Sequence, residues 1–111
     1  MSGISTHVLD TARGRPAAGI VVRLEAGAAD DWREIARGTT DADGRILALL
    51  PAGVPTEGEY RLRFATGDYF CHQKQDALYT EVIIQVWLEP AEKYHLPLLL
   101  SPFGYSTYRG S

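Results

Sequence analysis

The stretch Glu59-Tyr60-Arg61-Leu62-Arg63-Phe64 alternates strictly between charged residues and apolar or aromatic ones. That period of two is typical of a β-strand with one face on a core. Residues 22–26 and 84–88 repeat the pattern, and weaker versions of it occur at residues 5–10, 32–37, 46–49, 93–100 and 105–108. Together they predict an all-β, two-sheet β-sandwich of about eight strands.

Turn residues separate the predicted strands. The sequence Asp-Ala-Asp-Gly at residues 41–44 predicts a turn in which Gly44 adopts a positive φ, and residues 13–16 predict another. Residues 66–75 interrupt the alternation, and their first residues include a hydroxyl and an acid of the kind that cap a helix. We therefore expect one short helix around residues 67–75.

Length and composition favour one domain over residues 1–111. The chain has 111 residues and 45% hydrophobic content, enough for a single core. Its net charge is -3, with the basic residues scattered among acids, so we expect no nucleic-acid or membrane partner. The single cysteine, Cys71, and a first segment without the pattern of a secretory signal predict a cytoplasmic protein.

The run Leu96-Pro97-Leu98-Leu99-Leu100 is apolar on both of its faces. As a strand it would direct Leu96, Leu98 and Leu100 to one side and His95, Pro97 and Leu99 to the other. In a chain with one domain, a second subunit is the simplest cover for the second face. The alternative, a run buried wholly within one chain, stays open at this point.

Three histidines are candidates for chemistry: His7, His72 and His95. No two of them have the spacing of a zinc-binding helix or strand, so we expect no metal motif, and any site must be assembled by folding. A lone histidine in a strand is more often a hydrogen-bonded structural residue than a catalytic one. For His72, in the predicted helix, only the structural interpretation applies.

Other motifs of catalysis or binding are incomplete. Residues 104–108 begin like the turn of a serine hydrolase but have Tyr where its second glycine is needed. Arg45 occupies an oxygen-ligand position of what would be a calcium loop at residues 41–45. Cys71 lacks the charged neighbours of a reactive thiol. We interpret all three as structural.

Four segments resemble the 5-hydroxyisourate hydrolases, the transthyretin-related enzymes of urate breakdown. They are residues 5–10, 40–45, 94–102 and 104–111. The terminal Tyr108-Arg109-Gly110-Ser111 is the signature of these enzymes and distinguishes them from transthyretin, the hormone carrier that shares the fold. Departures from the family pattern fall in predicted loops, at residues 26–31 and 71–78.

The resemblance implies a transthyretin-like sandwich assembled as a homotetramer, a dimer of dimers with its active sites in the channel between dimers. It implies hydrolysis of 5-hydroxyisourate to 2-oxo-4-hydroxy-4-carboxy-5-ureidoimidazoline in purine degradation. The catalytic residues that it implies are His7, Arg45, His95 and Ser111. The substrate-binding residues that it implies are His7, Arg45, Tyr108, Arg109 and Gly110. It implies no cofactor and no metal.

Hydrolysis of a cyclic amide needs a water deprotonated, an oxyanion stabilised and a leaving nitrogen protonated. We expect one of His7 and His95 to take the proton of the water, Arg45 to hold carbonyl oxygens, and the C-terminal segment to orient substrate and water. Which histidine is the base stays open.

The alternative is a transthyretin-like carrier that binds a small ligand in the channel between dimers. In an apolar carrier channel, each unpaired polar group would cost roughly 1 to 3 kcal/mol. A third possibility, a sandwich that serves as an interaction module, predicts a secretion signal that the first residues lack.

Overall fold

The computed structural model describes residues 3–28, 30–51 and 57–111, which form nine strands and one helix. In chain order they are β1 (Gly3–Asp10), β2 (Arg15–Pro16), β3 (Val21–Ala28), β4 (Asp31–Thr39), β5 (Arg45–Leu50), β6 (Gly58–Phe64), α1 (Thr66–His72), β7 (Val82–Leu88), β8 (Lys93–Ser101) and β9 (Gly104–Thr107). The predicted β-sandwich is confirmed. The sequence did not predict β2, which lies within the stretch assigned to a turn.

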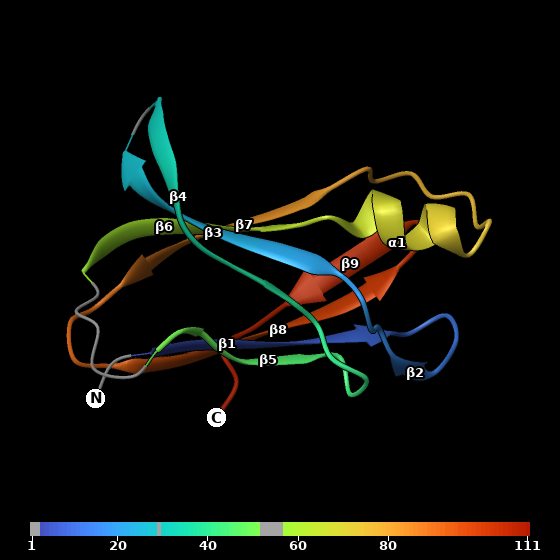
Figure 1. Ribbon diagram of the computed structural model, residues 1–111, viewed down its shortest axis with the longest axis horizontal. Coiled ribbons are helices and arrows are strands. Elements are labelled where there is room, and N and C mark those ends of the chain that lie inside the picture. Colours follow the sequence, from blue (N-terminus) through green and yellow to red (C-terminus); the bar gives the residue numbers. More distant parts are fainter. Residues whose placement is uncertain (1–2, 29, 52–56) are drawn as a thin grey trace.

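Two sheets form the two layers seen in Figure 1. The first sheet has the order β2-β1-β8-β9, with β5 also paired to β1, and the second has the order β4-β3-β6-β7. The core lies between them, because the alternation directs apolar side chains from both sheets inward. Fully buried members include Val8 and Leu98 from the first sheet and Leu24 and Leu62 from the second.

The helix α1 ends at His72, three residues earlier than predicted, because Lys74 adopts a φ of 56° that ends the helical conformation. The N-cap residue is Ala65, and its side chain makes no capping hydrogen bond. The predicted hydroxyl cap is therefore wrong: Thr66 lies inside the helix with its hydroxyl buried and without a hydrogen-bond partner among the described residues. Burial of Tyr69 and Phe70 fixes the helix instead.

The predicted loop at residues 26–31 is also mostly strand, since β3 continues to Ala28 and β4 begins at Asp31. The two strands pair along their whole length, so the hairpin extends beyond the alternating segment that the sequence shows. Gly44 has a φ of 75°, as predicted, and a Cβ there would lie 2.4 Å from the Val8 carbonyl oxygen.

The solvent face of the second sheet carries a cluster of opposite charges. Arg61 donates a hydrogen bond to Glu25, and Arg63 donates to both Glu25, at 3.3 Å, and Glu81, at 2.9 Å. Glu25 stands directly across the strand pair from Arg61. Because its carboxylate is nearly buried, the two guanidinium groups are needed to compensate its charge.

The parallel pair β1 and β8 forms the centre of the first sheet. Its register places Ser5 beside His95 and His7 beside Pro97, while β5 brings Arg45 opposite His7. The buried Thr6 hydroxyl donates to the Leu96 carbonyl oxygen at 2.7 Å and so joins the two strands on the core side. On the opposite face Pro97 is buried, but His95 and Leu99 are only half-buried, so the run is not covered at Leu99 by the described residues of its own chain.

Candidate active site

Strand pairing gathers the candidate polar residues on the outer face, the face of the first sheet that is turned away from the second sheet. Residues directly opposite each other in a sheet point to the same side. The pairs Ser5 with His95 and His7 with Arg45 therefore share one face, because Ser5 and His7 are two residues apart on β1. Residues 7, 45 and 95, which are far apart in the sequence, thus come together.

His95 is held by a defined hydrogen bond. Its Nδ1 lies 2.8 Å from the Ser5 hydroxyl oxygen, which leaves Nε2 as the ring nitrogen available to a ligand. Burial lowers the pKa of the His95 imidazole, and the charges of His7 and Arg45 lower it further. The imidazole is therefore neutral at pH 7 and able to accept a proton.

The tail, residues 108–111, continues the pairing of β9 with β8. Leu98 is opposite Thr107, and the separate bridge of His95 with Gly110 keeps the same antiparallel register. The Gly110 N–H donates to the His95 carbonyl oxygen at 2.7 Å. Thr107 adds a hydroxyl bond of 2.7 Å to the Pro97 carbonyl oxygen. The chain end therefore lies along β8 and not free in solvent.

Ser111 and Gly110 line a depression of about 460 Å³ on this face. Its other lining residues are Ser5, Arg45, Leu47, Lys93, Tyr94 and His95. Arg45 is exposed, and no acidic side chain in the described ranges pairs with it, so its donors are free for an oxygen-rich ligand. Three of the four predicted catalytic residues thus line one depression, and His7 lies on the same face beside it.

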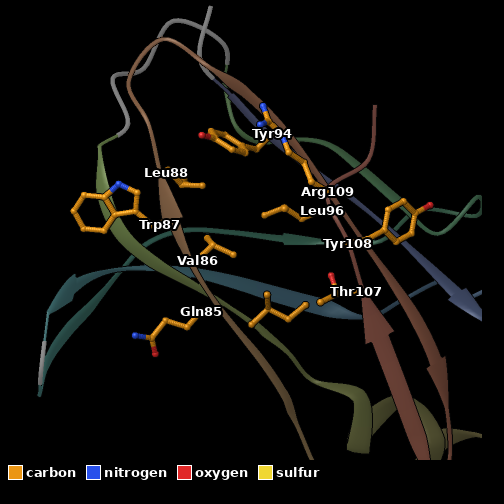
Figure 2. Close-up of a pocket in the computed structure, with 10 residues that line it drawn as sticks. Gln85, Val86, Trp87, Leu88, Tyr94, Leu96, Thr107, Tyr108 and Arg109 are labelled. Atoms are coloured by element: carbon orange, nitrogen blue, oxygen red, sulfur yellow. The ribbon is translucent and has the colours of Figure 1, made fainter.

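The Arg109 side chain points elsewhere. It lines an edge groove of about 470 Å³ between β7 and the tail, together with Trp87, Tyr94 and Thr107 among others. Figure 2 shows the Arg109 side chain beside Tyr94, whereas the ring of Tyr108 points away from Leu96 and Thr107. The bridge of Gly110 with His95 puts Gly110 on the side of His95 and Arg109 on the opposite side, while Tyr108 also lines the edge groove although its ring is turned away from it.

Sequence reasoning missed four lining residues, Ser5, Leu47, Lys93 and Tyr94. Ser5 was recoverable in part, since it precedes His7 by two residues and so shares its face in a strand. Its contact with His95 needs the β1 and β8 register, which one sequence does not show.

Arranged this way, the depression offers a neutral imidazole, a free guanidinium, hydroxyl groups and a chain end. Such a set suits a planar, carbonyl-rich ligand and transfer of protons to or from water. In the ranges that the structure describes, no three His, Cys, Asp or Glu side chains are grouped so that they could hold a metal ion. Nor does any helix there have the length and apolar character that crossing a bilayer requires.

Comparison with known proteins assigns the chain to a family. The model of the HIUase/Transthyretin family matches residues 4–110. The chain belongs to that family. Among curated members, the 5-hydroxyisourate hydrolase of Salmonella typhimurium is 45% identical over 109 residues, covering 97% of this chain and 80% of the relative.

Solved structures of the HIUase/Transthyretin fold agree with this one. The 5-hydroxyisourate hydrolase of Klebsiella pneumoniae has a TM-score of 0.85 and 36% identity, and the match covers 100% of this chain and 94% of that one. Sea bream transthyretin in complex with thyroxine has a TM-score of 0.90 and 32% identity, covering 97% and 94%. Similarity of fold alone therefore does not separate the two kinds of member.

Proposed function

We propose that this chain hydrolyses 5-hydroxyisourate to 2-oxo-4-hydroxy-4-carboxy-5-ureidoimidazoline, a step of urate and purine degradation. The observation that carries the proposal is the convergence of Arg45, His95 and Ser111 on one depression, with His7 beside it. A curated relative that is 45% identical over nearly the whole chain bears the name of this hydrolase.

The chemistry follows from the groups present. One imidazole, of His7 or His95, takes a proton from a water, whose oxygen adds to an amide carbonyl of the six-membered ring. Arg45 stabilises the resulting oxyanion through its guanidinium N–H groups. The carbon–nitrogen bond then breaks, and the leaving nitrogen receives the proton that the imidazole holds. Ser111 orients the water or the substrate at the open end of the depression.

The structure of the single chain supports different roles for the other residues of the tail. Gly110 forms part of the wall of the depression beside the His95 ring, whereas Tyr108 lines the edge groove and not the depression. Substrate contact by Tyr108 and Arg109, which the resemblance predicts, stays a prediction. The Arg109 guanidinium lies in the edge groove instead.

The assembly proposed is a homotetramer with active sites at the interface between dimers. Leu47, which lines the depression, exposes 74% of its surface in the single chain, and Leu99 is half-buried on the same face, so apolar area is available there for a second subunit. The strands β7 and β9 lie at sheet edges, so each has one side that pairs with no other strand among the described residues. The free thiol of Cys71, exposed on α1, suits the cytoplasm.

The carrier alternative is weaker because the outer face carries polar groups that an apolar ligand cannot bind. An apolar ligand would leave the free Nε2 of the half-buried His95 and the unpaired Arg45 guanidinium without partners. The same groups match the oxygens and nitrogens of a urate-derived ring.

The test is to add freshly made 5-hydroxyisourate to the pure protein and follow the product by circular dichroism. The substrate decays spontaneously, so optical activity of the product is the informative signal. We expect one product enantiomer to accumulate faster than the uncatalysed rate allows. A racemic product at the spontaneous rate would reject the hydrolase and favour the carrier.

A further inference from the structure

Arg109 makes three contacts with the first residues of β8 and the loop before it. Its guanidinium carbon lies 4.4 Å from the centroid of the Tyr94 ring, and Nη2 lies 3.3 Å from both the Glu92 carboxylate and the Lys93 carbonyl oxygen. Figure 2 shows the Tyr94 ring and the Arg109 side chain facing each other at the end of the edge groove. The guanidinium is thus held by stacking, charge and a backbone acceptor together.

The Tyr94 ring is itself fixed. It is 8% exposed, and its hydroxyl accepts a hydrogen bond of 2.9 Å from the Glu89 N–H. A guanidinium stacked on this ring therefore rests on the folded core and not on a mobile surface side chain.

The backbone of the tail has little else to hold it. The common register of β9 and the tail places Tyr108 opposite Pro97, which has no N–H to donate. Beyond Thr107, the isolated bridge of His95 with Gly110 is the one backbone pairing between the tail and β8 in the described residues. A single bridge at an exposed chain end is opened easily by water.

Alternation couples the two faces of the tail. Arg109 and Gly110 are consecutive residues of an extended segment, so they point to opposite sides of the sheet. When Arg109 is anchored on Tyr94, Gly110 is presented to the His95 ring, which it approaches so closely that a Cβ would lie 2.6 Å from the imidazole Cδ2. That carbon is the ring neighbour of Nε2, the nitrogen left free by Ser5.

We propose that Arg109 is a positioning residue: its guanidinium fastens the tail to β8, which holds Gly110 against the His95 imidazole and Ser111 in the depression. This inference rests on the proposed function for its catalytic consequence, but its structural part does not. Arg109 does not line the depression, and of the residues lining the edge groove only Tyr94 also lines the depression. Its effect on the reaction therefore passes through the tail.

The experiment compares Arg109→Ala and Arg109→Lys with the unchanged assembled protein, and Arg33→Ala serves as a control that removes another exposed arginine. The first measurement uses nuclear magnetic resonance without substrate, to follow exchange of the Gly110 amide and titration of the His95 imidazole. In Arg109→Ala we expect fast exchange of that amide. We also expect the His95 pKa to rise toward its ordinary value, since burial is the largest cause that lowers it.

The second measurement is the rate of hydrolysis. In Arg109→Ala we expect kcat to fall about 10-fold or more, because a displaced catalytic group loses its alignment. Arg109→Lys keeps the charge but loses the planar group that stacks on Tyr94 and donates several hydrogen bonds. Its kcat should therefore lie between those of Arg109→Ala and the wild type. Arg33→Ala should match the wild type in both measurements, and the unfolding midpoint should be unchanged throughout, because Arg109 is exposed.

Two outcomes would overturn the proposal. If Arg109→Ala loses activity while the Gly110 amide and the His95 titration are unchanged, Arg109 contacts the substrate directly. If neither the signals nor the rate change, the contacts with Tyr94 and Glu92 do not hold the tail. If the wild type fails to hydrolyse 5-hydroxyisourate, the proposed function fails, and the resonance measurement still decides whether Arg109 holds the tail.

Discussion

The Gly110 backbone lies directly against the imidazole of His95, and its N–H donates to the carbonyl oxygen of the same residue at 2.7 Å. One residue of the tail thus contacts both the backbone and the ring of a proposed catalytic residue. The next residue, Ser111, lines the depression beside that ring. Small displacements of the chain end should therefore move the His95 imidazole or change its surroundings.

Replacing Gly110 with alanine should damage catalysis more than folding. The new Cβ would lie 2.6 Å from His95 Cδ2 and 3.2 Å from the Pro97 ring, so either the tail or the imidazole must move. We expect kcat/KM to fall about 10-fold or more, with little change in the thermal midpoint. Gly104→Ala is the matched control, since its Cβ would make only an ordinary contact of 3.7 Å with Ser101 Oγ. Equal losses in the two variants would contradict this account.

Removing Gly110 and Ser111 together should abolish most turnover and leave the sandwich intact. Both residues lie outside the core, and the backbone bond to His95 is the contact that the fold would lose. Circular dichroism, the unfolding midpoint and the molecular mass in solution should match those of the full chain. Turnover that survives the deletion would show that the chain end takes no part in the chemistry.

The rate should depend on pH through His95. Its pKa lies below the ordinary value of 6.5, so the neutral imidazole persists below that pH and activity falls only in more acid solution. Because the folded pKa is the lower one, the folded state binds fewer protons, and His95 makes the fold less stable as pH falls below the unfolded value.

Replacing His7 with glutamine tests the electrostatic part of that shift. It removes one of the two charges that lower the His95 pKa, so the His95 pKa should rise while burial still keeps it below 6.5. Titration of the imidazole resonances in the substrate-free protein measures the change. A His95 pKa that does not move would mean that the two imidazoles do not interact.

Glu25 should stabilise the second sheet in a pH-dependent way. Burial tends to raise the pKa of its carboxyl, but the hydrogen bonds and charges of Arg61 and then Arg63 outweigh it and hold the pKa below its ordinary value of 4.5. Since the folded value is the lower one, the stabilisation is present above the unfolded pKa and is lost as pH falls through the folded value.

Glu25→Gln should therefore lower the free energy of unfolding by about 1 to 3 kcal/mol at pH 7, and the difference should shrink in acid. Urea unfolding of both proteins, at pH 7 and in acid solution, measures this difference in the free energy of unfolding. Glu34→Gln is the control on the same face, because Glu34 pairs with the exposed Arg37 and should matter less. Similar losses in both variants would mean that burial of Glu25 adds nothing.

Strand alternation was enough to predict most of the fold. Residues such as Leu62 and Phe64 follow a period of two because both sheets bury one face, so the pattern reports the architecture directly. The end of the helix was harder to predict. Lys74 ends α1 by adopting a positive φ, and a lysine side chain does not indicate that backbone conformation. The two-residue strand β2 is too short to show any period.

The resemblance predicted which residues belong to the candidate site but not their geometry, and their roles in catalysis stay predictions. His7, Arg45 and His95 meet through the pairing of β1 with β5 and β8, which are distant in the chain. Local patterns do not encode such pairings. The separation of Arg109 from the depression depends on the same information, because the side that it takes follows from its register against β8.

The length of the turn between β8 and β9 sets the register of the tail against β8. Ser101 stands opposite Gly104 across residues 102–103, and the Leu78 N–H donates to the Pro102 carbonyl oxygen at 2.8 Å. One residue more or fewer in that turn would shift the tail by one position against β8 and exchange its two sides. Arg109 would then lie on the side of the imidazole and Gly110 on the side of the edge groove, so a length change about seven residues upstream would exchange the groups presented to the site without altering one of its residues.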